Sequence, residues 1–97
     1  MEIKIKSLKF DADQKLIAYV GKKVSRLARF YGDSDTAEVT LSLLSDPDNK
    51  SVKIRVLAPG GDFVIERSSK SFEDAVSAAV DAMKEKLTRA KEKRNEA

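Results

Sequence analysis

Four cationic side chains recur on one face of a helix predicted between residues 15 and 31. Their spacings of seven, four and three residues place them in one row of the helix surface: Lys15, Lys22, Arg26 and Arg29. No acidic residue interrupts this segment. Ammonium and guanidinium groups arranged in this way can bind successive phosphates of a nucleic-acid backbone. The simpler interpretation is that these basic residues only keep the outer face of a surface helix in water.

A second group of cations gathers near the C-terminus, in the last turns of a helix predicted to begin after Ser71. Six of them lie within eleven residues: Lys84, Lys86, Arg89, Lys91, Lys93 and Arg94. Cations stabilise the carbonyl end of a helix dipole, but the effect fades beyond the last turn, so it explains only two or three of them. An outer acidic row divides the cations, and its member Glu85 can pair with Arg89 at i+4.

The residue types that most enzymes and metal sites need are missing from this chain. It contains no histidine and no cysteine, so it lacks an imidazole base, a thiolate and any disulfide. Ser68, Ser69 and Ser71 have no histidine to activate them. We therefore expect no catalysis, no cofactor, no metal ion and no small-molecule substrate.

Charge and hydropathy narrow the class of partner. The 97 residues carry 19 Lys and Arg against 16 Asp and Glu, a net charge of +3 that suits a polyanionic partner. No apolar run approaches the roughly 18 residues of a membrane span, and the N-terminus alternates charged and apolar residues rather than forming a signal peptide. The absence of cysteine suits the cytoplasm. We expect one cytoplasmic domain, residues 1–97, with a basic tail from about residue 91 and no membrane contact.

Alternating apolar residues predict four strands, at residues 3–8, 37–43, 52–57 and 63–67. Turn-forming residues at 46–49 and 59–62 make the last three strands successive antiparallel neighbours. The glycines of the second turn lead into a strand, which favours a hairpin over a phosphate-binding loop because such a loop must lead into a helix.

Two amphipathic helices complete the pattern. In the first, capped by Asp11 or Asp13 and ended by Gly32 and Asp33, the expected core residues are Leu16, Val20, Val24, Leu27 and Tyr31. In the second, capped by Ser71, the expected core residues are Phe72, Ala75, Val76, Ala79, Val80, Met83, Leu87 and Ala90. Phe10 is expected to pack inward. Gly21 indicates close packing or close approach of a partner, and the sequence does not decide between them.

These elements predict an α+β fold of order β-α-β-β-β-α, with a four-stranded mixed sheet similar to that of a double-stranded RNA-binding domain. A right-handed crossover should make the first two strands parallel. Two helices on one sheet face would lie side by side. Their cationic rows are then expected to border a common groove.

The order of the elements and three segments resemble the ribosome hibernation promoting factor family, also called ribosome-associated inhibitors. The segments are residues 16–31 (LIAYVGKKVSRLARFY), 52–62 (VKIRVLAPGGD) and 71–93 (SFEDAVSAAVDAMKEKLTRAKEK). Glu73 and Glu85 depart from the family pattern, which often has an aromatic residue and a cation there. The chain is similar to the short type, which lacks the dimerising domain of long members.

The resemblance implies a partner and a set of binding residues. Family members enter the small ribosomal subunit between head and body, cover the messenger and transfer RNA sites, and inhibit translation in stationary phase and under stress. We expect this protein to be monomeric away from the ribosome. It would either dimerise ribosomes with the help of a separate partner protein or inactivate single ribosomes. The rRNA-facing positions implied here are Lys22, Lys23, Arg26, Arg29, Lys86, Arg89, Lys91 and Lys93.

Two other functions compete with ribosome binding. The first is a general structured-RNA-binding protein. A double-stranded RNA-binding domain binds duplex phosphates with lysines at the start of its last helix, and the acidic Glu73 and Asp74 at this position disfavour that mode of binding. Base stacking on surface aromatics is also disfavoured, because Phe63 and three others are expected in the core. The second alternative is a protein-interaction module that uses the uncovered sheet face. Its residues would be Thr40, Ser42, Arg55, Leu57, Val64 and Glu66.

Overall fold

Four strands form one mixed sheet in the order β1-β2-β3-β4. The computed structural model describes residues 1–31, 36–45, 47, 49–58 and 61–96, with side chains described at all of these except 30, 31 and 94–96. The strands are β1 (Glu2–Leu8), β2 (Thr36–Leu43), β3 (Lys50–Ala58) and β4 (Gly61–Ser69). β1 is parallel to β2, and the other two pairs are antiparallel, which confirms the predicted mixed sheet.

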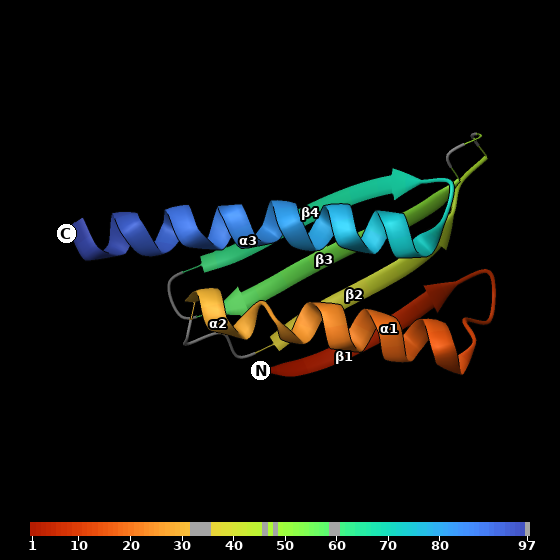
Figure 1. Ribbon diagram of the computed structural model, residues 1–97, viewed down its shortest axis with the longest axis horizontal. Helices are drawn as coiled ribbons and strands as arrows, with labels where there is room; N and C mark the ends of the chain where they lie inside the picture. The colour runs from red at the N-terminus through yellow and green to blue at the C-terminus, as the bar shows by residue number, and fades with distance from the viewer. Residues whose placement is uncertain (32–35, 46, 48, 59–60, 97) are drawn as a thin grey trace.

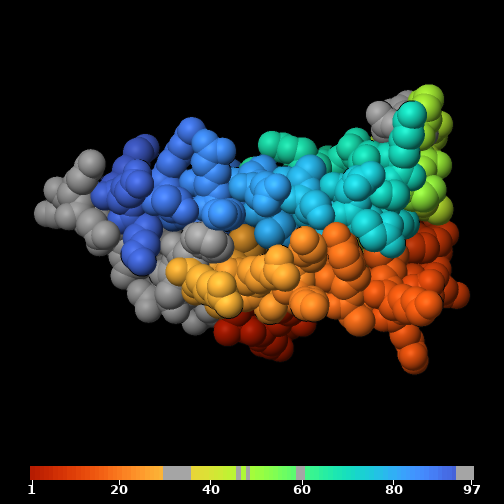
Figure 2. Space-filling view, viewed as in Figure 1, coloured from red at the N-terminus to blue at the C-terminus, as the bar shows by residue number. Residues whose placement is uncertain are grey.

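The helices lie on one face of this sheet. They are α1 (Gln14–Ser25), α2 (Ala28–Tyr31) and α3 (Phe72–Glu96), and α3 therefore includes the segment from residue 91 that we expected as a tail. Figure 1 shows α1 over β1 and β2 and α3 over β3 and β4, with α2 beside the C-terminal end of β3. α1 and α3 run in the same direction, so their C-terminal halves lie at the same end of the molecule. In Figure 2, α1 and α3 touch along most of the length of α1.

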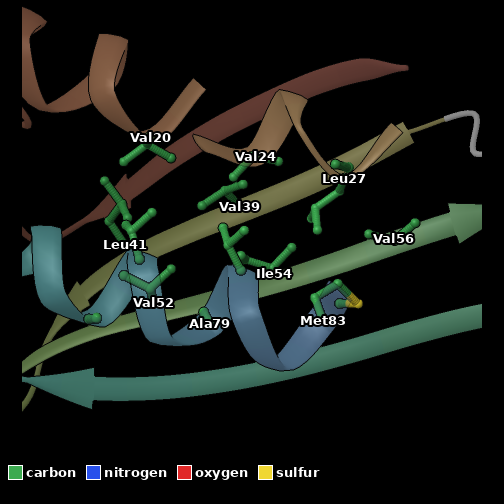
Figure 3. Packing of buried hydrophobic residues seen from close by; sticks show 14 of the residues in the cluster. Val20, Val24, Leu27, Val39, Leu41, Val52, Ile54, Val56, Ala79 and Met83 are labelled. Atoms are coloured by element: carbon green, nitrogen blue, oxygen red, sulfur yellow. The ribbon is translucent and has the colours of Figure 1, made fainter. Parts of the chain in front are cut away.

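The core lies between these helices and the sheet. In Figure 3, Val20, Val24 and Leu27 point towards side chains of β2 and β3, and Ala79 and Met83 approach them from α3. All the core positions predicted on α3 are buried except Ala90, which is half-buried against the cluster. The predicted core residue Tyr31 lies outside the described side chains. Leu8 and Leu43, at the ends of their strands, are exposed.

The predicted first helix is interrupted. It was expected to run unbroken from Lys15 to Tyr31, but α1 ends at Ser25 and α2 begins at Ala28. The backbone N–H groups of Arg26, Leu27 and Arg29 each donate to the carbonyl three residues earlier, in place of the four-residue spacing of an α-helix. Leu27 lies in this tighter turn and is fully buried.

The predicted helix starts are confirmed, and one loop is fixed by aromatic packing. Asp13 Oδ1 accepts a hydrogen bond from Leu16 N at 2.8 Å, and Ser71 Oγ accepts one from Asp74 N at 3.1 Å. Before α1 the rings of Phe10 and Phe72 stack with centroids 5.0 Å apart, as expected of an inward Phe10. The break expected at Gly32 and Asp33 lies outside the described residues, as do parts of both predicted turns.

Gly21 is not required by close packing of α1 on the sheet. A Cβ added there would have its nearest contact, 3.9 Å, with Ile5 Cδ1, which is an ordinary van der Waals distance. The structure therefore removes one of the two explanations that the sequence left open for this glycine.

Replacing Leu27 with alanine should destabilise the fold strongly. Leu27 is fully buried in the turn between α1 and α2, where both the lost burial and the cavity left behind are unfavourable. We expect the free energy of unfolding to fall by about 2–5 kcal/mol in denaturant melts. A loss below about 0.5 kcal/mol, the range typical of surface positions, would contradict the packing described here.

Candidate nucleic-acid interface

A basic groove separates α1 and α2 from α3. Its volume is about 290 Å³, and its cations are Lys23, Arg26, Arg29 and Lys84. Asp81, Ser77 and Val80 complete the lining. Four cations against one carboxylate make this groove a site of positive potential on the helix side of the molecule.

Contacts between the helices fix one wall of this α1/α2–α3 groove. The hydroxyl groups of Tyr19 and Ser77 share a hydrogen bond of 3.1 Å, which ties α1 to α3. Lys23 Nζ lies 5.7 Å from the centroid of the Tyr19 ring, within reach of a cation–π interaction. Tyr19 therefore positions Lys23 at the groove while its hydroxyl group holds the helices together.

A second and larger groove lies on the other side of α3, between this helix and strand β4. Its volume is about 590 Å³, and its cations are Arg67, Lys86, Arg89 and Lys93. Phe63, Ile65, Ala82 and Ala90 provide apolar lining, and Glu85 is its carboxylate. This α3–β4 groove thus combines an apolar surface with a cationic rim.

Three contacts orient the rim of the α3–β4 groove. Lys86 Nζ donates to the Val64 carbonyl oxygen at 3.2 Å, reaching from α3 to the edge strand. Arg67 Nη1 donates to the carbonyl oxygen of Glu66 at 2.8 Å. Arg89 pairs with Glu85 at 2.5 Å, as the i,i+4 spacing predicted, so Glu85 is partly neutralised by its own helix.

The sheet face away from the helices carries balanced charge. On this face, strand alternation and register bring together Lys4, Lys6, Lys53 and Arg55 with Glu2, Glu38, Asp62 and Glu66. Four cations against four carboxylates leave no net charge among the described strand residues on this face. The positive charge that could attract a polyanion is therefore on the helix side.

The closest ion pair on the open face is between Arg55 and Asp62, at 2.6 Å. Through its hydrogen bond, Arg55 holds the pKa of Asp62 below its usual range, and Asp62 raises the pKa of Arg55 in the same way. Any stability from Asp62 is present above the ordinary pKa of the carboxyl group and is lost as the pH falls through its lowered value. Both side chains are over 40% exposed, so this contribution is small.

The described residues hold no group of three or more His, Cys, Asp or Glu side chains placed to bind a metal ion. Within the same part of the chain, no helix has the length and apolar character needed to cross a membrane.

Comparison with known proteins relates the whole fold to one family. The family model described as sigma 54 modulation protein / S30EA ribosomal protein matches residues 3–95. The chain belongs to this family. The membership confirms the resemblance seen in the sequence, and it is a family of ribosome-associated proteins rather than of enzymes. A search of curated protein sequences gave no significant match.

Two solved structures show the same architecture as this family member. The N-terminal domain of Protein Y from Thermus thermophilus is 31% identical, with a TM-score of 0.80 over 92% of this chain and 98% of that one. A ribosomal subunit interface protein from Coxiella burnetii is 18% identical, with a TM-score of 0.84 over 94% of this chain and 98% of that one. The predicted β-α-β-β-β-α fold is thereby confirmed.

The cations predicted from the sequence do not border one common groove. Lys23, Arg26 and Arg29 line the α1/α2–α3 groove, whereas the residues on the far side of α3 are Lys86, Arg89 and Lys93. Lys22 and Lys91 line neither groove, although both are exposed on the helices. The expectation of one shared groove holds for Lys84 alone among the α3 cations that line the grooves, because Lys86, Arg89 and Lys93 lie on the side of α3 that faces β4.

Sequence reasoning missed two groove cations and misjudged one aromatic residue. Arg67 was missed as a site residue, although it follows Phe63 and Ile65 in the same strand alternation. Lys84 was noticed in the cluster but not assigned to the site, and it lines the α1/α2–α3 groove from α3. Phe63 was expected in the core, but it is only half-buried and lines the α3–β4 groove.

Proposed function

We propose that this protein binds the small ribosomal subunit between its head and body, covers the messenger and transfer RNA sites, and thereby inhibits translation as a hibernation factor. The observation that carries this proposal is the separation of charge: two cationic grooves lie on the helix side, and the open sheet face is balanced. Such a surface can settle on folded RNA in one orientation, since only one of its faces attracts phosphate.

The names of the family and of its structural relatives support the ribosome as the source of that RNA. One relative is called a ribosomal subunit interface protein, and the family includes a ribosomal protein by name. Ribosomal RNA also offers the irregular folded surfaces that proteins recognise by shape and by phosphate contacts. In this proposal the protein acts in the cytoplasm, binds as a monomer, and serves in stationary phase or stress.

The proposed rRNA-binding residues are Lys22, Lys23, Arg26, Arg29, Lys86, Arg89, Lys91 and Lys93. Six of them line the two grooves, and two more groove cations, Lys84 and Arg67, join them. Phosphate contacts from both sides of α3 would hold this helix against the RNA along its C-terminal half. Contacts of this kind fix orientation without reading sequence, as a shape-directed inhibitor requires.

The proposal predicts which ribosomal particle the protein follows on a gradient. Mixed with purified small and large subunits, the protein should sediment with the small subunit, and less of it should do so once messenger and initiator transfer RNA are bound. A naked structured RNA of similar length is the control. Equal binding to that RNA would favour a general RNA-binding protein, and binding to small subunits undiminished by messenger and transfer RNA would contradict the proposed site.

A further inference from the structure

The two basic grooves differ in what they can hold. The α1/α2–α3 groove is small, and Val80 is the one large apolar residue among its described lining residues. The α3–β4 groove has twice the volume, and Phe63, Ile65, Ala82 and Ala90 give it an apolar surface. Phosphate groups need hydrogen-bond donors, which these four side chains lack. The cations on the rim can supply those donors, so the apolar surface is left for a different part of the ligand.

We propose that the α3–β4 groove holds an unpaired base of the bound RNA, with flanking phosphates on Arg67, Lys86, Arg89 and Lys93. This assignment rests on the RNA-binding function proposed above. Unpaired bases are bound by aromatic and apolar side chains together with arginine, the types present here. The volume of about 590 Å³ falls within the roughly 300–1,000 Å³ of small-ligand pockets, enough for one nucleotide.

The position of the Phe63 ring is set by its own strand. A Cβ added to Gly61 would clash with Phe63 Cζ, so the ring occupies the space that a side chain at 61 would need. Phe63 and Gly61 are two residues apart and therefore lie on the same face of β4. The glycine thus lets the ring lie close to the strand, next to the groove that it lines.

An acidic peptide added as a strand to the edge of β4 is the competing occupant. Lys86 already uses the Val64 carbonyl oxygen on β4, at 3.2 Å, so an added strand would have to replace that contact. Charged residues placed at a sheet edge are a common protection against strand addition. A base and its phosphates require no such replacement, because Lys86 can donate more than one hydrogen bond.

Filling the groove without changing charge tests the inference. Ala82→Leu adds apolar volume to the groove lining, and Ala18→Leu makes the same change on an exposed part of α1 as a matched control. The probes are oligouridylate and a ribose-phosphate oligomer of equal length that lacks bases. The wild-type protein should bind oligouridylate about five- to hundredfold more tightly than the abasic oligomer, the range expected for one stacked base. Circular dichroism and thermal melts establish that each variant is folded.

Ala82→Leu should remove most of this preference while leaving affinity for the abasic oligomer within about twofold, since no charge changes. Ala18→Leu should keep the preference. If Ala82→Leu fails to fold, Phe63→Leu provides the second test, with the same expected loss. Equal affinity of the wild-type protein for the two oligomers would overturn the inference, and so would equal displacement of oligouridylate by oligoglutamate.

These outcomes separate the base site from ribosome binding. A wild-type protein that binds small subunits but does not prefer oligouridylate would leave the proposed function standing and remove the base site. A preference for oligouridylate without small-subunit binding would support the base site and contradict the ribosomal function.

Discussion

Reversing the charge of Arg26 and Arg29 together should lower the affinity for small subunits by at least about a hundredfold. Both side chains line the α1/α2–α3 groove and are exposed. Hydrogen bonds to charged groups contribute about 1.5–3 kcal/mol each, and the two carboxylates of Arg26→Glu with Arg29→Glu would also repel phosphate. In a purified translation system this double variant should no longer inhibit synthesis. Filter binding or sedimentation gives the affinity directly.

The matched control reverses two charges on the open sheet face. Lys6→Glu with Lys53→Glu changes the net charge by the same amount on the side away from the helices. Arg55 is avoided because it pairs with Asp62 at 2.6 Å, so reversing its charge would also place two carboxylates side by side. The control should keep most of the inhibition, apart from a small general loss of attraction. Equal loss in both variants would mean that only net charge matters, and loss in the control alone would move the site to the sheet.

Salt should weaken small-subunit binding steeply. The two grooves present eight cations, and about six phosphate contacts would reduce affinity roughly a thousandfold between 50 and 200 mM monovalent salt. The physical reason is that each neutralised phosphate releases bound counterions, and this release is less favourable at high salt. Titrations at several salt concentrations give the slope of log affinity against log salt.

Neutral substitutions measure how much individual cations contribute to the slope of log affinity against log salt. Removing two phosphate contacts with Arg26→Ala and Arg29→Ala should reduce the magnitude of the slope by about two, since each lost contact removes about one. Lys6→Ala with Lys53→Ala should leave it almost unchanged. A nearly flat response of the wild-type protein would contradict an interface built on phosphate contacts.

The elements could be predicted from local patterns because burial here follows regular periods. Val39, Leu41, Ile54 and Val56 alternate with polar residues and are all buried. The break between α1 and α2 was not visible in this way, since residues 25–28 contain neither glycine nor proline. Arg26 and Leu27 donate hydrogen bonds to carbonyl groups three residues earlier, and this tighter turn is compatible with a buried Leu27. A helical period of 3.6 residues also places Leu27 in the core, so the pattern of apolar residues is the same with or without the break.

The site could be predicted only in part, for a similar reason. Residue type and spacing identified the cations of both helices, because charge and helical period are local properties. Their division between two grooves depends on which element lies beside each face of α3. Lys86 contacts Val64, 22 residues away, and no local pattern indicates that pairing. Arg67 was missed because its partner surface is formed by the helix that follows it.

Electron cryo-microscopy of the protein bound to purified small subunits tests the central claim most directly. We expect density for the domain between head and body, with α1, α2 and the C-terminal half of α3 against ribosomal RNA, and the open face of the sheet turned away from it. Phosphates should lie beside Arg26 and Arg29. Density at a site outside the messenger channel, or an orientation with the open face of the sheet against RNA, would contradict this claim.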